Sequence, residues 1–367
     1  MKNRFSLLGG LAVLSIGVAL AGCDPNKDKP AEGGTSAPSS AVAPGVGAAP
    51  AAGAGNYKVI TNGISPFWDS MGKGLEAAKA DLKCSADWQG PSPAENNAQV
   101  NLFKTAVASK VDGIGVSVIE AKAMVPVIDD AIKQGIPVIT FDSDSPESKR
   151  LAYIGTNNFE AGRTAGMEAV KLFPNGGKLV AFVGNMGAQN ARDRYNGMVE
   201  AVKGHNIVFL QAPFEDNKDK GKARKNVEDA ITRYQAQGLN GLVGLYSYNG
   251  PAIVSAVEAQ GLRAKMKIVC FDGEPETLNN LGKGLVDVTV VQKPYEFGRL
   301  SVKLLDLLKK DKNDIDKALG EMKPELDKMN MKIDTKQHVI DTGVDVITPA
   351  NAAPFLKSLK DRGLSST

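Results

Sequence analysis

Histidine and cysteine are scarce in this chain of 367 residues, which has two histidines and three cysteines. His205 and His338 lie far apart, and no Cys/His cluster exists, so the sequence predicts no zinc site. Cys84 and Cys270 lie at the ends of apolar runs, which is typical of free thiols, with a disulfide between them as the alternative. We therefore expect no metal and no cofactor.

Sequence motifs of the common catalytic sites are also absent. The chain has no Gly-x-Ser-x-Gly elbow, no Walker loop and no dinucleotide-binding glycine fingerprint. Asp142 and Asp272 could imitate the paired carboxylates of a glycosidase, but facing carboxylates also occur in binding proteins. We expect a protein that is not an enzyme.

The charge pattern gives little support for nucleic-acid binding. The formal net charge is only +3, and part of it belongs to the first few residues. Lysine and acidic residues alternate through 218–228 and 309–328, as is usual for solvated helix faces. We therefore expect no nucleic-acid partner.

What the chain does have begins at its N-terminus. Lys2 and Arg4 precede an apolar stretch, residues 7–20, and the run Leu20-Ala21-Gly22-Cys23 follows. This order is typical of an export signal. The run resembles the bacterial lipobox, in which the cysteine is lipidated after cleavage. We expect residues 1–23 to be a lipoprotein signal peptide with lipidation at Cys23. A plain secretory signal with an incidental cysteine is the alternative.

Residues 24–55 are rich in Ala, Gly, Pro and Ser, and they contain no aromatic residue. Such a tract cannot bury a core, so we expect a flexible tether. Together with the leader, it predicts a protein in the periplasm or on the outer face of the cytoplasmic membrane, held there by its lipid.

Short apolar runs then alternate with longer helical patterns. Several runs are apolar almost throughout, which indicates parallel strands covered on both faces. The candidate strands are 57–61, 86–89, 113–118, 137–141, 179–183, 207–210, 241–245, 267–271 and 286–291. The candidate helices include 68–82, 98–109, 125–134, 161–172, 191–202 and 227–235. Repeated strand–helix units predict an α/β fold with parallel sheets.

These units are too many for one small sheet, so we expect two doubly wound lobes. The N-terminal lobe would comprise residues 56–156, completed by 293–338. The C-terminal lobe would comprise residues 157–292, completed by 339–367. A chain that crosses several times between two lobes forms a hinge with a cleft beside it.

Polar and aromatic side chains follow the strands, where ligands bind in open α/β sheets. They include an amide, a carboxylate or a guanidinium after most strands, and aromatic rings after the first. Such groups suit a hydroxyl-rich ligand: carboxylates accept from hydroxyls, arginine donates as a planar fork, and rings cover apolar C–H faces. Taken singly, Asp142 and Asn190 could cap helices, and Phe67 and Trp68 could be core residues.

The chain resembles the periplasmic sugar-binding proteins of the ribose/galactose type. The resemblance covers nearly all of residues 57–291 and continues more loosely beyond. It is carried by Ser65-Pro66-Phe67-Trp68, Pro137-Val138-Ile139-Thr140-Phe141-Asp142, Ala191-Arg192-Asp193-Arg194, Tyr248-Asn249, Val269-Cys270-Phe271-Asp272-Gly273 and Val291-Gln292. It implies the type I periplasmic binding protein fold and a role as the substrate-binding lipoprotein of an ABC-type importer.

By the same resemblance, Phe67 and Trp68 stack on the sugar, and polar side chains bond its hydroxyls. Ribose-type members carry an arginine after the aspartate that matches Asp142, whereas this chain has Ser143 and then Asp144, which leaves room for a larger ligand or one contacted by Asp144. Ser65 stands where ribose-type members carry an asparagine. The predicted ligand-binding set is Ser65, Phe67, Trp68, Asp142, Ser143, Asp144, Asn190, Arg192, Asn249, Asp272 and Gln292.

We expect a monomer that binds a monosaccharide or related polyol and delivers it to a membrane permease. The alternative is a sugar or autoinducer receptor of the same fold that feeds a chemoreceptor or a sensor kinase. A sugar-responsive repressor would need an N-terminal helix-turn-helix, and an export signal stands there instead.

Overall fold

The computed structural model of this protein describes residues 54–367. Residues 1–53, with the predicted signal peptide, Cys23 and nearly all of the predicted tether, lie outside the described residues. In the described part, strands and helices alternate and form two sheets in which most neighbouring strands are parallel. The expected α/β fold with two sheets is confirmed.

The first sheet has the strand order β12-β13-β5-β4-β3-β1-β2. All its pairs are parallel except β12 with β13. β3 and β4 are buried at every residue, as expected for central strands covered on both faces. The strands are β1 (Asn56–Ile60), β2 (Ser85–Gln89), β3 (Gly113–Val116), β4 (Val138–Phe141), β5 (Ala152–Gly155), β12 (Lys332–Asp334) and β13 (Val339–Asp341).

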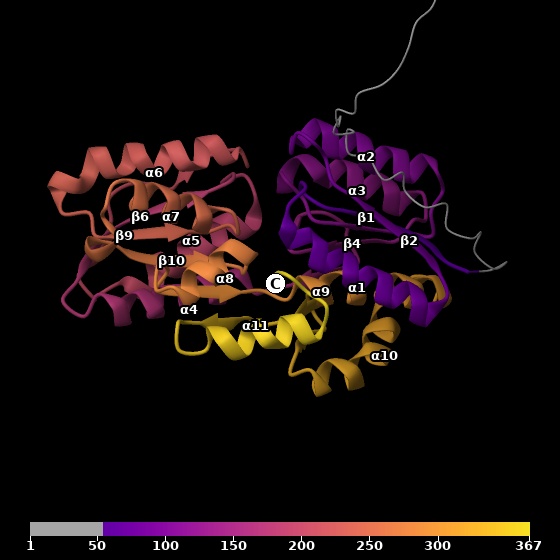
Figure 1. Cartoon of the computed structure of the whole chain (residues 1–367). Coiled ribbons are helices and arrows are strands. Elements are labelled where there is room, and N and C mark those ends of the chain that lie inside the picture. The colour runs from indigo at the N-terminus through magenta and orange to yellow at the C-terminus, as the bar shows by residue number, and fades with distance from the viewer. Residues whose placement is uncertain (1–53) are drawn as a thin grey trace, which may run out of the picture. The chain divides into compact units, whose positions relative to one another are not determined.

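Helices cover both faces of this sheet (Figure 1). On one face α1 (Pro66–Leu82) packs against α9 (Pro294–Lys310), and α10 (Ile315–Lys328) contacts α9 and adds apolar side chains to the same core. On the other face lie α2 (Asn96–Ala108) and α3 (Ala121–Lys133) over a second core layer. We call this sheet and its helices the first lobe.

The second sheet has the order β14-β11-β10-β9-β6-β7, with β8 paired to β6. On one face lie α4 (Asn158–Leu172) and α5 (Gln189–Val202), and on the other α6 (Lys220–Tyr234) and α7 (Asn249–Ala259). We call this sheet and its helices the second lobe. Its remaining elements are β6 (Gly177–Val183), β7 (Ile207–Phe209), β8 (Phe214–Glu215), β9 (Gly241–Gly244), β10 (Lys267–Phe271), β11 (Val288–Val291), β14 (Asp345–Ile347), α8 (Pro275–Gly282), α11 (Ala352–Asp361) and the short 3₁₀ helices Gln235–Gln237 and Arg263–Lys265.

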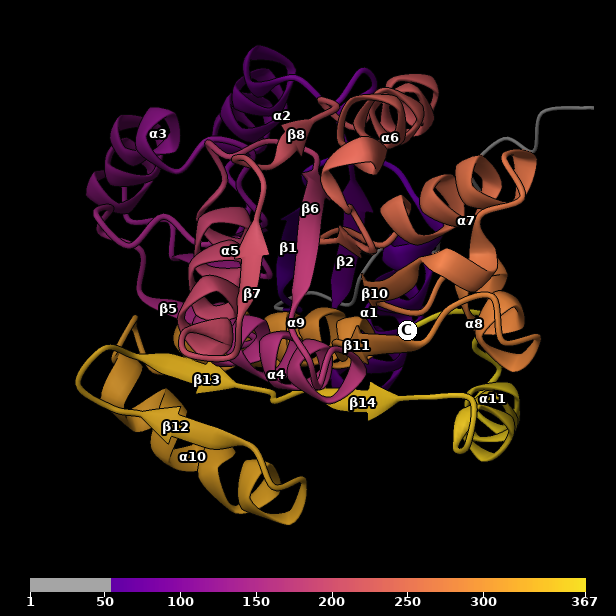
Figure 2. The ribbon, with the colours of Figure 1, turned by 90° about the vertical axis from the view of Figure 1, so that its left-hand side faces the viewer.

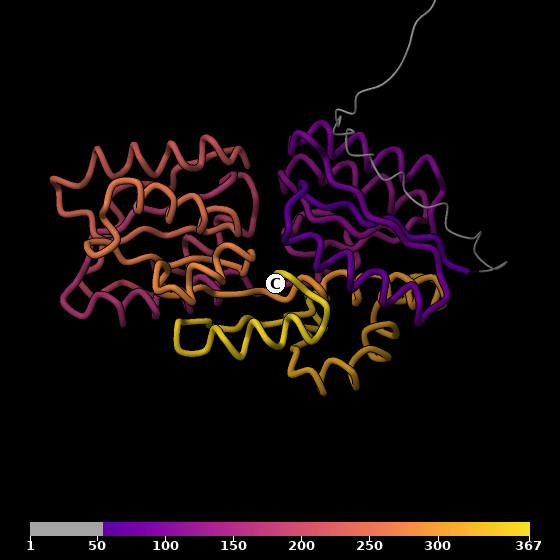
Figure 3. Tube along the Cα trace, in the orientation of Figure 1, coloured from indigo at the N-terminus to yellow at the C-terminus, as the bar shows by residue number. Residues whose placement is uncertain are grey.

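The chain passes between the lobes at three places, which can be followed along the trace in Figure 3. It crosses after β5, after β11 and between β13 and β14. Figure 2 shows β13 between β12 and the rest of the first sheet, and β14 at the edge of the second sheet. Residues 339–367 were expected in the C-terminal lobe, but Val339–Asp341 pairs with β5 of the first sheet. The last crossing therefore falls between residues 341 and 345.

The nine predicted strands are all present, with ends shifted by a few residues. The sequence did not predict the strands β5, β8 and β12, nor that β13 belongs to the first sheet. These strands have only two to four residues, which is too short for a clear pattern of apolar residues. Cys84 and Cys270 are free thiols. In residues 54–367 we find no helix with the length and apolar character needed to cross a bilayer.

Candidate ligand-binding site

A cavity of about 740 Å³ is lined by residues of both lobes. The lining residues follow the carboxyl ends of strands: Asn62 follows β1, Asp142 follows β4, Asp272 follows β10 and Gln292 follows β11. This is where parallel sheets with helical crossovers present loops and helix N-termini to a ligand. The volume falls within the range of small-molecule sites.

The structure brings most of the predicted site residues to this cavity. Those that line it are Ser65, Phe67, Trp68, Asp142, Asn190, Asp272 and Gln292. Those that do not line it are Ser143, Asp144, Arg192 and Asn249.

Asp142 and Asp272 occupy matching places in the two lobes. Each follows the last residue of its strand, and each has a left-handed backbone, with φ of 57° and 62°. Left-handed backbone is uncommon for residues with a side chain, although aspartate tolerates it better than most. Strained residues of this kind often mark functional sites, because the strain aims a side chain where the fold needs it.

Asp142 is buried and held from within the first lobe. Its Oδ2 accepts hydrogen bonds from Ser117 Oγ at 2.7 Å and from Asn62 Nδ2 at 3.3 Å. Burial raises the pKa of Asp142, although Arg194 and the Ser117 hydroxyl favour the charged form. The carboxylate is thus fixed in position and desolvated, which strengthens any hydrogen bond it accepts from a ligand.

Arg194 and Gln292 lie beside Asp272 in the second lobe. Arg194 Nη1 lies 3.9 Å from Asp272 Oδ2, and Gln292 Nε2 donates to Asp272 Oδ1 at 3.0 Å. Arg194 Nη2 and Gln292 Oε1 are buried and have no protein partner among residues 54–367. Two residues that line the cavity therefore carry one donor and one acceptor without a partner among the described residues. Burial raises the pKa of Asp272 to about 6 despite these neighbours.

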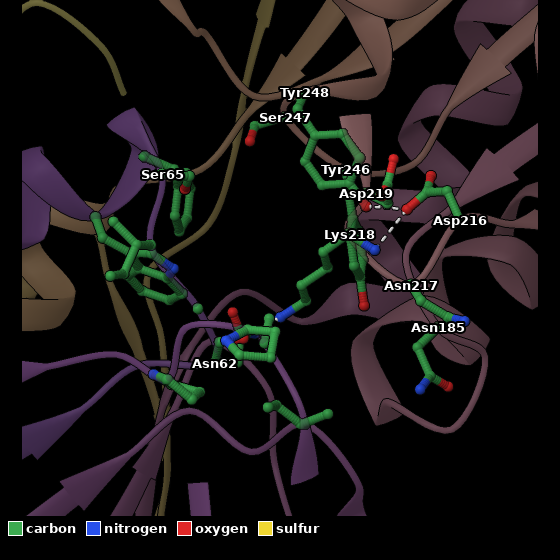
Figure 4. Close-up of a pocket in the computed structure, with 18 of the residues that line it drawn as sticks. Asn62, Ser65, Asn185, Asp216, Asn217, Lys218, Asp219, Tyr246, Ser247 and Tyr248 are labelled. Atoms are coloured by element: carbon green, nitrogen blue, oxygen red, sulfur yellow. Dashed lines mark hydrogen bonds between the residues drawn. The ribbon is translucent and has the colours of Figure 1, made fainter. Parts of the chain in front are cut away.

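Rings line the cavity from both lobes. In the first lobe Phe67 and Trp68 contact each other edge to face, with ring centroids 4.8 Å apart. Both rings also belong to the apolar core of the first lobe. The sequence left open whether Phe67 and Trp68 are core or ligand-binding residues, and in the structure they pack in the core and also line the cavity. In the second lobe Tyr246 and Tyr248 line the cavity, and the Tyr246 hydroxyl donates to Asn190 Oδ1 at 3.0 Å (Figure 4 labels both tyrosines).

Arg192 lies elsewhere. Its guanidinium donates to the carbonyl oxygens of Met186 at 2.9 Å and Gly187 at 2.6 Å, and to Gln189 Oε1 at 2.7 Å. It stabilises the loop before α5 and does not line the cavity. Arg192 and Arg194 are two residues apart on α5, so they point to nearly opposite sides of the helix. The guanidinium at the cavity is that of Arg194.

The side chains of Asp144 and Asn249 have structural partners, whereas the Ser143 hydroxyl has none among residues 54–367. Asp144 forms a bidentate ion pair with Arg150, at 2.6 and 2.7 Å, and so is not directed at the cavity. Asn249 Nδ2 donates to Asp216 Oδ2 at 3.0 Å, and its Oδ1 accepts from the Tyr246 backbone. Ser143 is fully buried next to β4. Ser143 and Asn249 are adjacent in sequence to cavity residues, and Asp144 is two residues from Asp142, but none of the three lines the cavity.

Residues 58–313 match the periplasmic binding protein domain family. The chain belongs to the periplasmic binding protein family. The xylose/arabinose-binding protein XylF of Sulfolobus acidocaldarius is 24% identical over 84% of this chain and 73% of its own length.

Solved structures agree with this membership. A solute-binding protein of an ABC transporter from Burkholderia graminis, in complex with D-arabinose, has 28% identity and a TM-score of 0.71, covering 81% of this chain and 96% of that chain. A structure of the XylFII–LytSN complex has 27% identity and a TM-score of 0.68, covering 81% of this chain and 98% of that chain.

Several lining residues of this periplasmic binding protein were not predicted from its sequence. They are Asn62, Arg194, Asp216, Lys218, Tyr246 and Tyr248. Arg194 and Tyr248 stand within the segments that carried the family resemblance, but the pattern did not show which neighbour faces the ligand. Asp216 and Lys218 had no signal, because an acidic and lysine-rich stretch is typical of solvated surface.

Proposed function

We propose that this protein binds one monosaccharide or related polyol in the cavity between its lobes and delivers it to the membrane permease of an ABC importer. One observation carries the proposal: the rings of Phe67 and Trp68, two buried carboxylates and a buried guanidinium with a free donor line one cavity. Rings cover the apolar faces of a sugar, while Asp142, Asp272 and Arg194 bond its hydroxyls. The sugars bound by similar proteins support this ligand class.

Closure of the lobes on the sugar follows from the distribution of these groups. Asp142 belongs to the first lobe, whereas Arg194 and Asp272 belong to the second. A ligand that contacts both sets favours the conformation in which they converge, because only that conformation offers all the bonds. The permease would then recognise the ligand-bound arrangement.

The site binds without chemical conversion in this proposal. Its buried carboxylates are engaged by protein donors: Asp142 by Ser117 and Asn62, and Asp216 by Tyr248 and Asn249. Asp142 is thereby fixed where it can accept a hydrogen bond from a guest hydroxyl, and Asp216 is held by the protein itself.

A thermal-shift screen with the full chain tests the proposal. D-ribose, D- and L-arabinose, D-xylose, D-allose, D-glucose, D-galactose and D-fructose form the panel. At 100 times its dissociation constant, a ligand that binds only the folded state stabilises it by about 2.7 kcal/mol. We expect one or more panel sugars to raise Tm by several degrees and to be recovered with unchanged mass. Sucrose at equal concentration controls for solvent effects, and no shift beyond that control would refute the proposal.

We also propose that the mature chain begins at a lipidated Cys23 and acts as a monomer, tethered by residues 24–55 to the membrane surface outside the cytoplasm. Cys23→Ser removes the thiol that accepts the lipid. We expect this variant in the membrane-free fraction of the producing bacterium, whereas the wild type stays with the membranes. Equal fractionation of the two proteins would contradict lipid anchoring, and the Cys84→Ser variant is the matched control.

Signalling is the second candidate, because a structural neighbour was solved as the XylFII–LytSN complex. The two candidates share the same cavity and differ in the partner of the ligand-bound form. Genes for a permease and an ATPase beside the gene of this chain would favour import, and a sensor gene in that place would favour signalling.

A further inference from the structure

Lys218 enters the cavity from the second lobe by way of a strained turn. It lies between β8 and α6, and both Asn217 and Lys218 have left-handed backbone, with φ of 55° and 63°. A left-handed backbone conformation costs free energy at a non-glycine residue, and here two such residues are consecutive. Contacts elsewhere in the fold must therefore hold them in this conformation. The Lys218 backbone N–H donates to Asp216 Oδ1 at 2.8 Å, and the Asn217 N–H donates to the Gly184 carbonyl at 2.8 Å.

Asp216 is the residue that fixes this turn. It is fully buried, and it accepts from the Tyr248 hydroxyl at 2.5 Å and from Asn249 Nδ2 at 3.0 Å, as well as from the backbone of Lys218. Figure 4 shows Asp216, Tyr248 and the start of Lys218 grouped on one side of the cavity. Its oxygens are therefore engaged, and Asp216 acts as a positioning residue.

The amine of Lys218 reaches the opposite lobe. Lys218 Nζ donates to the backbone carbonyl of Asn62, whose amide in turn donates to Asp142 Oδ2 at 3.3 Å. Figure 4 shows the lysine side chain extended across the cavity toward Asn62. An ammonium group has three donors, and this contact uses one of them. Others remain for an acceptor on a ligand.

The charges around the cavity give the amine a second role. Asp142, Asp216 and Asp272 are each no more than 3% exposed, whereas Arg194 is the only fully buried cation among the lining residues described. Three buried carboxylates facing one guanidinium leave an excess of negative charge, which Lys218 reduces. Burial lowers the pKa of Lys218 to about 7, while Asp142 and Asp216 favour its charged form.

We propose that Lys218 is a specificity-determining residue, which donates to an oxygen of the bound sugar and offsets the buried carboxylates, so that the site prefers a neutral sugar to the corresponding amino sugar. The inference rests on the proposed function and specifies its ligand class. In the wild type, the charged amine of Lys218 would repel an ammonium group on the ligand. Once Lys218 is removed, the buried carboxylates of the cavity would attract that group instead.

Titration calorimetry on the full chain tests this role. The probes are the panel sugar with the largest thermal shift and its derivative with one hydroxyl replaced by an amino group. Lys218→Met keeps the apolar stem and removes the amine. We expect this variant to bind the neutral sugar about tenfold or more weakly, as expected for the loss of one charge-assisted bond. We also expect the preference for the neutral over the amino sugar to fall by about tenfold or more.

Two further variants separate this role from effects on folding. Lys218→Gly relieves the left-handed strain, so it should fold at least as stably as the wild type and show the same loss of preference. Lys225→Met removes an exposed lysine of α6 that pairs with Asp229, and we expect unchanged binding of both probes.

The possible outcomes are distinct. Unchanged affinity and preference in both Lys218 variants would overturn the inference, and so would an equal loss for the two probes. If no panel sugar binds the wild type, the proposed function itself fails.

Discussion

Replacing Arg194 by methionine is expected to weaken sugar binding by more than a hundredfold. Arg194 is 1% exposed, and its Nη2 has no protein partner in the described part of the chain. Loss of the guanidinium removes the donor for ligand hydroxyls and leaves Asp272 buried without its nearest cation. Bonds to charged groups contribute about 1.5–3 kcal/mol each, so two lost bonds amount to about 3–6 kcal/mol.

Arg192→Met is the matched control for this prediction. Arg192 is bonded to the loop before α5 and does not line the cavity, so we expect affinity to change only a fewfold. Calorimetry with the best panel sugar measures both variants. A large loss for Arg192→Met together with retained binding by Arg194→Met would contradict the assignment.

Folding of the Arg194 variant has to be checked, because its side chain also bonds Asn158 Oδ1 and the Leu245 carbonyl, each at 2.8 Å. Loss of the guanidinium leaves these two buried acceptors without their donor, which is destabilising. Arg194→Lys keeps the charge and most of the volume but lacks the planar fork. We expect it to fold with a smaller loss of stability and still to bind weakly. Wild-type affinity in a folded Arg194→Lys would contradict a role for the fork.

Replacing Asp272 by asparagine is expected to weaken binding by about a hundredfold, because one charge-assisted bond to the sugar becomes a weaker neutral one. The same change should stabilise the protein without its ligand. Burial raises the pKa of Asp272 from its ordinary value of 3.8 to about 6. The charged carboxylate therefore destabilises the folded state, by an upper value of about 3 kcal/mol.

The raised pKa of Asp272 predicts how the difference in stability between Asp272→Asn and the wild type changes with pH. The folded protein holds the Asp272 proton more tightly than the unfolded chain does, so the cost of the charge is complete above about pH 6 and disappears as the pH falls toward 4. We expect Asp272→Asn to have a higher free energy of unfolding than the wild type at pH 7.5, and the two to converge at low pH. Chemical denaturation at several pH values measures this difference.

The control for this experiment is Asp345→Asn at an exposed position of β14. This change should leave stability and binding close to the wild-type values at every pH. If the wild type is more stable than Asp272→Asn at pH 7.5, the neighbours of Asp272 stabilise its charged form. The expectation that Asp272 lowers stability while it strengthens binding would then be wrong.

The sequence predicted two aspartates that line the cavity, Asp142 and Asp272, but indicated an arginine that does not line it. Asp142 and Asp272 were found because each follows a continuous apolar strand, and the end of a buried parallel strand fixes where the next residue lies. Arg194 was missed in favour of Arg192. The sequence does not show at which residue α5 begins, and a shift of two positions turns a side chain to the other side of the helix.

The loops before α6 and α7 show the same limit. Tyr248-Asn249 was one of the segments that carried the family resemblance, but Tyr248 lines the cavity whereas Asn249 donates to Asp216. Lys218 had no signal, since its charge matches the solvated residues around it, and only its left-handed turn carries it to Asn62.

By itself, the sequence determined the alternation of strands and helices, the division into two sheets and the strand ends at which a ligand would lie. These features follow from local patterns, because burial of a strand on both faces requires apolar residues in an unbroken run. Only the tertiary structure decided which side chains at those ends face the cavity, and which lobe receives β13. Those choices depend on helix starts, left-handed turns and pairing with distant strands, which join residues that are far apart along the chain.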